Sequence, residues 1–146
     1  MILSLIDRKT GIGITMSKSH EKHLKRANDL SMLGKDLARR SHSKCELCAA
    51  TGVSLAPYEV APVPTEPDID KTLFICEICT TQIEHPKQMD ANHWHCLSAA
   101  VWSAVPVVQV MAVRVLERLK DKEGWAGDLY DQLYLEPEIR EWVDHS

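Results

Sequence analysis

Hydrophobic and polar positions change their spacing twice along the chain. Residues 19–40 carry leucines near one stripe of a helix, with Lys and Arg on the remaining faces, which predicts an amphipathic helix. Residues 45–79 instead contain two short runs typical of strands, Val53–Val60 and Leu73–Ile75. The intervening residues 61–70 hold three prolines and three acids, so we expect an exposed loop joining the strands of a β-hairpin.

From Asp90 onward the spacing is helical again. Asp90 is expected to cap a helix in which Trp94, Leu97 and Val101 recur at i, i+3 and i+7. Because residues at this spacing share one face of a helix, we expect that face to be buried.

A second helix is predicted after Ser103, with Pro106 in its first turn, where a missing N–H costs little. We expect Gly124 to end it. Its expected inward face follows the 3.6-residue period and comprises Val108, Met111, Ala112, Val115 and Leu119. Two shorter helices should follow, one lined by Trp125, Leu129 and Leu133, and one opened by Pro137 that carries Ile139 and Trp142.

The first fifteen residues alternate apolar side chains with Gly11 and Gly13 and show no helical period. Met16 follows directly. One interpretation is that Met16 is an alternative translation start and that residues 1–15 are an extension without a structural role. The intact mass of protein expressed from its native start tests this interpretation.

Length and composition limit the number of domains, and the positions of the tryptophans indicate where the core lies. The chain has 146 residues, of which 45% are hydrophobic and 26% charged, so one compact domain, alone or with an arm, is expected. All four tryptophans lie after residue 90. Because tryptophan buries a large apolar area, we expect the main core there.

Opposite charges separate along the chain. Residues 1–44 carry ten Lys or Arg against four Asp or Glu, whereas residues 45–146 carry seven against seventeen. The basic arm indicates either an anionic contact through residues 18–44 or a solvated helical face. Because the acidic body has few aromatic residues to stack on bases, we expect a protein partner, with at most weak, salt-sensitive nucleic-acid contact. The candidates for that contact are Lys22, Lys25, Arg26, Arg39 and Arg40.

Membrane and secretory signals are missing from the sequence. No apolar run approaches the roughly 20 residues that a membrane-spanning helix needs. The charges near the start follow the apolar Met1–Ile6 and do not precede it, which is unlike a secretory signal. We therefore expect a cytoplasmic protein without membrane contact. In that reducing compartment, paired cysteines are more often metal ligands than disulfides.

Two C-x-x-C pairs carry the strongest chemical signal. They are Cys45-Glu-Leu-Cys48 and Cys76-Glu-Ile-Cys79, with 27 residues between them. Each pair places two sulfurs on one tight turn, and two such turns supply four soft ligands for tetrahedral zinc. Because four thiolates close the coordination sphere, we expect one structural Zn²⁺. Two disulfides or a redox-active dithiol are the alternatives.

These patterns together predict an α+β fold in three parts. We expect a basic, partly helical arm over residues 1–40 and a four-cysteine zinc-ribbon β-hairpin unit over residues 41–89. A helical bundle over residues 90–146 should pack on that unit.

A second group of reactive side chains comprises His93, His95 and Cys96. A Cys–His nucleophile, a second metal site and a nuclease-like histidine are conceivable here. In a helix, however, His93 and His95 point about 200° apart and cannot clamp one ion. We expect these residues to cap and pack. His42 and His85 flank the cysteine pairs, and the alternative is that they lend contacts to the pairs or replace one of the ligands. The sequence holds no P-loop, G-x-S-x-G, G-x-G-x-x-G or H-E-x-x-H motif.

A long series of segments carries a resemblance to a known family. The segments are Ser43–Cys48, Tyr58–Val60, Phe74–Cys79, Gln82–Glu84, Asp90–Leu97, Val101–Val110, Leu116–Leu119, Gly124–Ala126, Leu133–Leu135 and Trp142. Over roughly residues 41–146 the chain resembles the PhnA/YjdM-type zinc-ribbon proteins, named after an alkylphosphonate-utilisation operon. The resemblance implies zinc ligands at Cys45, Cys48, Cys76 and Cys79. Longer members continue into a small β-barrel-like carboxy-terminal domain, which this sequence, ending at Ser146, lacks.

We therefore expect a non-catalytic zinc-ribbon protein that serves as an accessory or interaction module linked to phosphonate metabolism. The alternative is a hydrolase-type enzyme of phosphonate or phosphoester metabolism that uses His93, His95 or Cys96. Metal stoichiometry separates the two, because one zinc per chain fits a structural site and two would favour a catalytic one.

Overall fold

A two-stranded antiparallel hairpin brings the two cysteine pairs together. The computed structural model describes residues 5–7, 12–14 and 17–146. Strand β3 (Leu55–Glu59) pairs with β4 (Thr72–Cys76) in a register that sets Leu55 opposite Cys76. The predicted hairpin is confirmed. Its register places the start of the second cysteine pair beside the segment that follows the first pair. In the connection between the strands, five of the ten residues 61–70 are exposed and the other five half-buried, and it ends in a short 3₁₀ helix, η1 (Ile69–Lys71).

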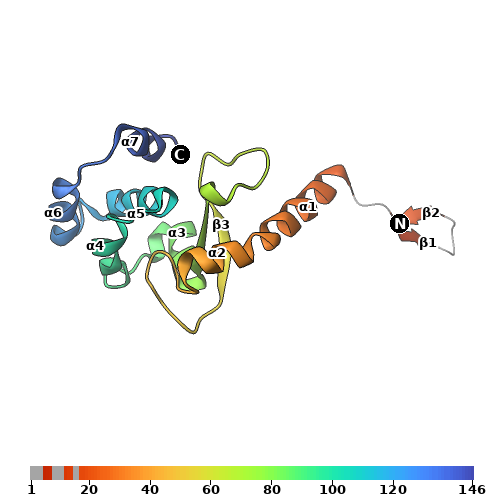
Figure 1. Cartoon of the computed structure of the whole chain (residues 1–146), viewed down its shortest axis with the longest axis horizontal. Coiled ribbons are helices and arrows are strands. Elements are labelled where there is room, and N and C mark those ends of the chain that lie inside the picture. The colour runs from red at the N-terminus through yellow and green to blue at the C-terminus, as the bar shows by residue number, and fades with distance from the viewer. Residues whose placement is uncertain (1–4, 8–11, 15–16) are drawn as a thin grey trace.

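Two helices precede the hairpin where one helical segment was expected. Helix α1 (Lys18–Met32) and helix α2 (Gly34–Ser41) are separated at Leu33. In Figure 1, α1 projects from the body along the long axis, and none of its residues is buried. Leu37 of α2 is fully buried, so the expected leucine stripe packs only at its carboxy-terminal end.

At the amino-terminal end, two short strands pair with each other. They are β1 (Leu5–Asp7) and β2 (Ile12–Ile14). Met16, the candidate alternative start, lies outside the described residues.

The helix expected from Asp90 is replaced by a tighter turn. The Asp90 carboxylate accepts a hydrogen bond from the backbone N–H of Asn92, but regular helix begins only with the 3₁₀ helix η3 (His93–Cys96), followed by α4 (Leu97–Ala100). Gln82 Oε1 accepts hydrogen bonds from the Asp90 backbone and the Trp94 indole, which ties this turn to the preceding helix. The predicted stripe is nevertheless fully buried, at Trp94, Leu97 and Val101.

Helix α5 (Pro106–Leu119) is the central helix of the body. Every residue of its predicted inward face is buried, which confirms that prediction. The expectation that Gly124 ends this helix was wrong. The backbone N–H groups of Lys122 and Glu123 both bond to the Leu119 carbonyl and close the helix, and Gly124 opens the next one. The two final helices are α6 (Gly124–Gln132) and α7 (Pro137–Asp144).

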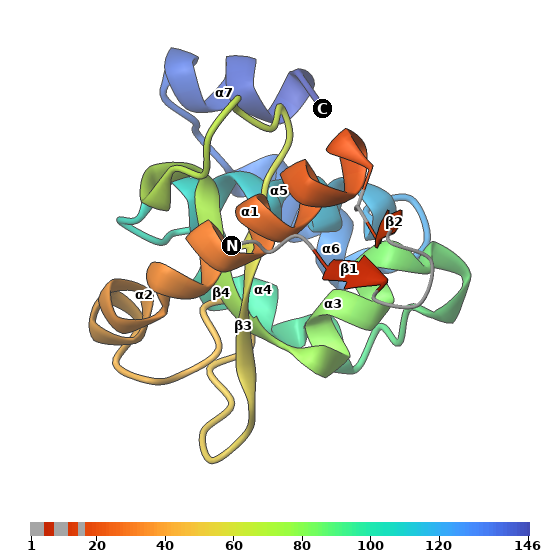
Figure 2. The same cartoon turned by 90° about the vertical axis from the view of Figure 1, so that its right-hand side faces the viewer.

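The hairpin and the carboxy-terminal helices share one hydrophobic core. Helices α4–α7 lie on one side of the hairpin and α1 on the other (Figures 1 and 2). Helix α3 (Glu77–Glu84) continues directly from β4, and the 3₁₀ helix η2 (Pro86–Gln88) follows it. The fold is therefore α+β, as the sequence predicts, with seven α-helices and two strand pairs among the described residues. The division at residues 40 and 89 stays a prediction.

Candidate metal centre

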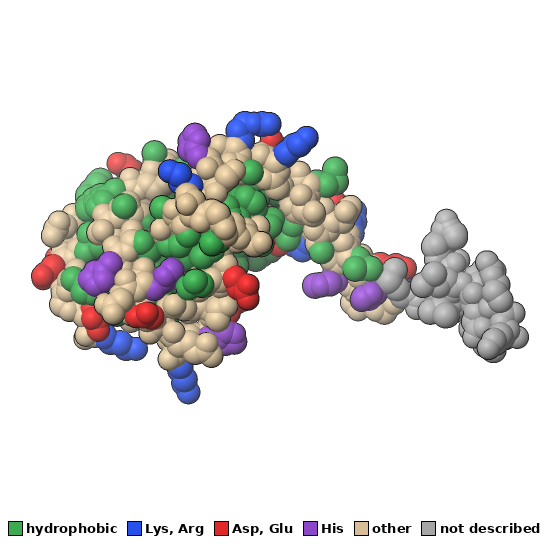
Figure 3. Space-filling model, turned by 90° about the horizontal axis from the view of Figure 1, so that it is seen from below, with side chains coloured by type: hydrophobic (Ala, Val, Ile, Leu, Met, Phe, Trp, Pro, Cys, Tyr) green, Lys and Arg blue, Asp and Glu red, His purple; other side chains and the backbone are tan. Residues whose placement is uncertain are grey.

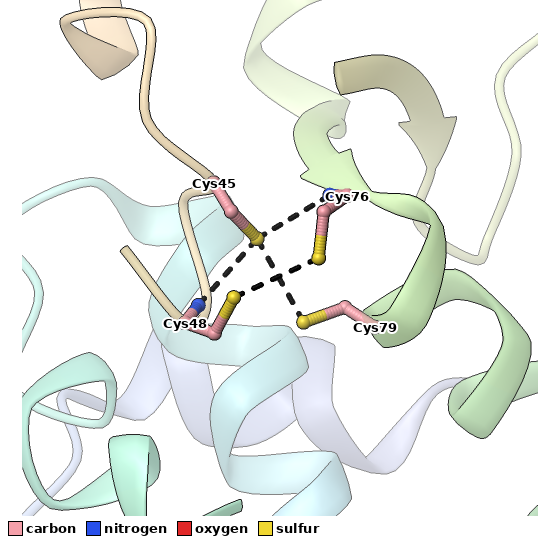
Figure 4. A group of neighbouring side chains, drawn as sticks. All are labelled: Cys45, Cys48, Cys76 and Cys79. Atoms are coloured by element: carbon pink, nitrogen blue, oxygen red, sulfur yellow. Dashed lines mark hydrogen bonds between the residues drawn. The ribbon is translucent and has the colours of Figure 1, made fainter. Parts of the chain in front are cut away.

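Four cysteine sulfurs converge at the end of the hairpin. The Sγ atoms of Cys45, Cys48, Cys76 and Cys79 all lie within 4.8 Å of one another. Two pairs are closer, with Cys45 and Cys79 at 3.7 Å and Cys48 and Cys76 at 3.6 Å. Figure 4 shows the four side chains pointing toward a common centre.

These distances fit a tetrahedral metal ion. A Zn–S bond of about 2.3 Å gives a tetrahedron whose sulfurs stand about 3.8 Å apart. The two short separations lie close to that length, and both are far longer than the roughly 2.05 Å of a disulfide. All five cysteines are free thiols. The residues present therefore fit a four-thiolate metal site.

The first cysteine turn is built from a tight backbone loop. The Ala49 N–H bonds to the Cys45 carbonyl at 2.8 Å, and the Cys45 N–H bonds to the Ala50 carbonyl at 3.0 Å. Ala49 adopts a positive φ of 63° to close the loop. The backbone N–H of Cys48 then points at Cys45 Sγ at a distance of 3.5 Å, so the turn supplies a donor to one of its own sulfurs.

The second cysteine turn joins a strand to a helix. Cys76 ends β4 and is the N-cap residue of α3, so Cys79 lies in the first turn of that helix. The amino-terminal end of a helix favours negative charge, which suits a thiolate. The Cys76 backbone N–H also donates to Cys45 Sγ at 3.4 Å, and this bond links the two turns.

A buried ion pair fixes the first turn to the rest of the hairpin. Arg40 of α2 makes a two-pronged contact with the carboxylate of Glu46, at 2.6 and 2.9 Å, and donates to two backbone carbonyls near β4. Glu46 also accepts the backbone N–H of Phe74 at 2.8 Å. The side chain of Glu46 is only 5% exposed. This network therefore holds the residue between the first two cysteines against the second strand.

The crowded sulfurs cannot all ionise unaided. The hydrogen bond shared with Cys79, together with backbone N–H groups, lowers the pKa of Cys45 to about 4. The same bond to Cys45, followed by burial, raises the pKa of Cys79, and burial raises the pKa of Cys48 to about 12. The Cys45 thiolate is thus stabilised, while ionisation of Cys48 and Cys79 is disfavoured. A divalent cation removes this conflict, because it attracts every thiolate at once.

His93 contacts the cluster, a role that the sequence reasoning missed. Its Nε2 lies 3.2 Å from Cys79 Sγ, and its ring meets the Trp94 ring edge-on with centroids 4.9 Å apart. When the sulfur is a thiolate, it accepts a hydrogen bond from this imidazole N–H. His42 and His85, the alternative named for such contacts, make no hydrogen bond to a sulfur among the described residues. His93 reaches the cluster because its turn is held to α3 by the two hydrogen bonds of Gln82. The spacing of residues along the sequence does not show this contact.

The other two members of the second reactive group, His95 and Cys96, make contacts that differ from those of His93. The His95 ring packs on Trp125, with centroids 4.2 Å apart. Cys96 is half-buried, and burial raises the pKa of its thiol to about 11. Within the described residues, no hydrogen bond joins His93, His95 and Cys96 to one another, although His93 and Cys96 line the same pocket.

Several basic residues of the arm have partners within the chain. Four of the five candidates for nucleic-acid contact form ion pairs: Lys25 with Asp29, Arg26 with Glu59, Arg39 with Asp36 and Arg40 with Glu46. Arg26 also donates to the carbonyls of Pro64 and Thr65, which docks α1 on the proline-rich loop. Contact with nucleic acid through residues 18–44 stays a prediction.

In the described part of the chain, no helix has both the length and the apolar character needed to cross a membrane. No protein-family model, curated protein or solved structure matches this chain.

Proposed function

We propose that this chain is a structural zinc protein of the PhnA/YjdM zinc-ribbon type. In this proposal it acts as a non-catalytic accessory or interaction module linked to phosphonate metabolism. The observation that carries the proposal is the closed set of four sulfurs, all within 4.8 Å of one another. Four thiolates would occupy every position of a tetrahedral ion and leave none for substrate or water.

Zinc is the metal that best suits this donor set. Soft thiolate ligands in a tetrahedral arrangement favour zinc or iron over calcium and magnesium, which prefer oxygen. The ligands would come from two turns at one end of a β-hairpin, which is the arrangement that the ribbon proposal requires. The ion would join the two cysteine turns directly, in addition to the hydrogen bonds that already link them.

Metal content tests the proposal directly. The purified chain should contain one zinc per molecule by elemental analysis and native mass spectrometry. Cys48→Ser and Cys76→Ser should each lose most of that zinc. Cys96→Ser is the matched control, because it removes a thiol outside the four-sulfur cluster, and it should retain one zinc. Two zinc ions per chain, or loss of zinc from the Cys96 variant, would contradict the proposal and favour the hydrolase alternative.

The link to phosphonate metabolism comes from the sequence resemblance and has its own test. Phosphonate-transport genes beside the gene for this chain would support the link. A neighbourhood without such genes would leave the zinc site unaffected and remove the metabolic part of the proposal.

A further inference from the structure

The two cysteine turns have nearly the same sequence but opposite surroundings. In the first turn, Glu46 is held in a buried ion pair and Leu47 is only 3% exposed. In the second turn, Glu77 is exposed and Ile78 is 58% exposed. One turn is therefore tied into the fold, while the tip of the other faces solvent.

The exposed tip belongs to a wider apolar surface. Ile78 lines a pocket of about 500 Å³ together with Val53, which is 47% exposed, and with Ala50. Cys48 and Cys96 form part of the same wall. A single exposed aliphatic residue is common on protein surfaces, but two such residues around one concave pocket are typical of a binding site.

The walls of this pocket come from two segments that adjoin the cysteine pairs. Ile78 lies between two ligand cysteines in the first turn of α3, and Val53 lies in the short segment between the first cysteine turn and β3. Metal bound by the cysteines would fix both segments. A preformed pocket binds with little ordering cost, which favours recognition of a partner side chain.

The charge at the edge of the pocket indicates which charge the partner carries next to its apolar side chain. Glu77 lines the pocket, and among the described residues it forms no ion pair. Residues 45–146 carry seventeen Asp or Glu against seven Lys or Arg. Figure 3 shows a face of the body on which hydrophobic side chains lie among acidic and histidine ones, with a few Lys or Arg side chains at its edges. An apolar pocket edged by a free carboxylate fits an apolar side chain that has a cation next to it.

We propose that the second cysteine turn and its pocket bind a protein partner through one apolar side chain flanked by Lys or Arg. Val53 and Ile78 would enclose the apolar group, and Glu77 would pair with the cation. This inference rests on the proposed function as an interaction module, and it names the contact surface and the chemistry of the partner.

Selection from a random twelve-residue peptide library displayed on phage tests the inference on the zinc-loaded full chain. The selected peptides should share an aliphatic or aromatic residue within two positions of a Lys or Arg. Synthetic copies should bind at least tenfold more weakly to Ile78→Asp. They should bind equally well to Val63→Asp, the matched control, because Val63 is 53% exposed but lies outside the pocket. Glu77→Lys should shift the selection toward Asp or Glu beside the apolar residue.

Other results would overturn the inference. One is selection of peptides without a basic residue. Another is equal binding of the peptides to the Ile78→Asp and Val63→Asp variants. A third is that the wild-type chain enriches no peptides beyond those that the Ile78→Asp variant enriches. A dimer of the wild-type chain that Ile78→Asp dissociates would also overturn it, because the occupant would then be a second copy. Zinc content measured on the same samples separates the two proposals. One zinc per chain without peptide binding rejects only the inference, whereas absent zinc rejects the proposed function.

Discussion

His93 is placed to act on the charge of the sulfur cluster, because its Nε2 lies 3.2 Å from Cys79 Sγ. An N–H donated to a ligand thiolate withdraws charge from the sulfur and fixes its direction. We expect His93→Leu to weaken zinc binding roughly 10- to 100-fold, the range typical for residues that orient metal ligands. Competition with a chromogenic zinc chelator measures this change.

His95→Leu provides the control for this measurement. His95 lies two residues away and packs on Trp125 without contacting a sulfur. Its variant should hold zinc as tightly as the wild type, even if stability falls. Equal zinc affinity in the two histidine variants would show that the contact to Cys79 does not influence the ion.

Arg40 is the second residue at which a single substitution should change the stability of the fold by a predictable amount. Arg40→Met would leave the carboxylate of Glu46 buried and unpaired, which costs about 3–5 kcal/mol in comparable buried pairs. Arg40→Lys should recover only part of this loss, since a lysine cannot reproduce the fork that contacts Glu46 and two carbonyls. Urea denaturation at constant zinc measures both variants. A loss below 1 kcal/mol in Arg40→Met would mean that the ion pair is not important for folding.

The sequence predicts the four cysteines but not the residues that support them. C-x-x-C spacing is local, so two sulfurs of each pair are positioned by neighbouring backbone alone. The partner of His93 is fourteen residues away, and Arg40 contacts carbonyls 29 and 32 residues further along the chain. Contacts at such separations depend on how elements pack, which residue types and spacing do not reveal.

Among the elements, α5 and α6 meet at an unusually close point. A Cβ added at Gly127 would lie 2.9 Å from the backbone carbonyl oxygen of Lys120, at the end of α5. Because backbone atoms cannot move aside cheaply, Gly127→Ala should push α6 outward and cost about 1–3 kcal/mol. This cost should exceed the gain in helix propensity of up to about 1 kcal/mol. Thermal denaturation followed by circular dichroism measures the difference.

Gly124→Ala is the matched control for the helix contact. It lies in the same helix, and a Cβ there would meet no atom within 4 Å. The substitution should be neutral or stabilise by up to about 1 kcal/mol. If both alanine variants unfold at the same temperature, the close approach at Gly127 does not limit the packing of α6.

At this scale, the sequence predicts the existence of elements better than their ends. The period of apolar residues identifies the inward face of α5 because the helix packs against neighbours along its length. Gly124 was misplaced because glycine is common both after a helix and at a helix start, and only the bonds to the Leu119 carbonyl decide between them. The 3₁₀ form of residues 93–96 depends on Gln82, which lies in another helix.

For the whole molecule, one continuous core makes the metal site and the helices interdependent. Cys45 and Leu47 of the first cysteine turn belong to the same buried cluster as Val110 and Leu116 of α5. Structural zinc contributes about 10–16 kcal/mol in zinc-finger peptides. At this chain length each kcal/mol changes Tm by roughly 2–4 °C. Removal of zinc should therefore lower Tm by roughly 20 °C or more, in a single transition.

Calorimetry with and without a chelator checks this prediction. Added zinc should restore the original Tm in the wild type but not in Cys76→Ser. Two separate transitions after chelation would show that the helices around α5 fold independently of the cysteine turns, in contrast to the shared core.

Trp94 gives this coupling an optical signature. Its indole is inaccessible to solvent, bonded to Gln82 and in edge contact with the ring of His93, which in turn reaches Cys79. A buried tryptophan emits at shorter wavelength than a hydrated one. Loss of the ion should therefore shift the intrinsic fluorescence of the chain to the red, so that metal loading can be followed in real time without any added dye.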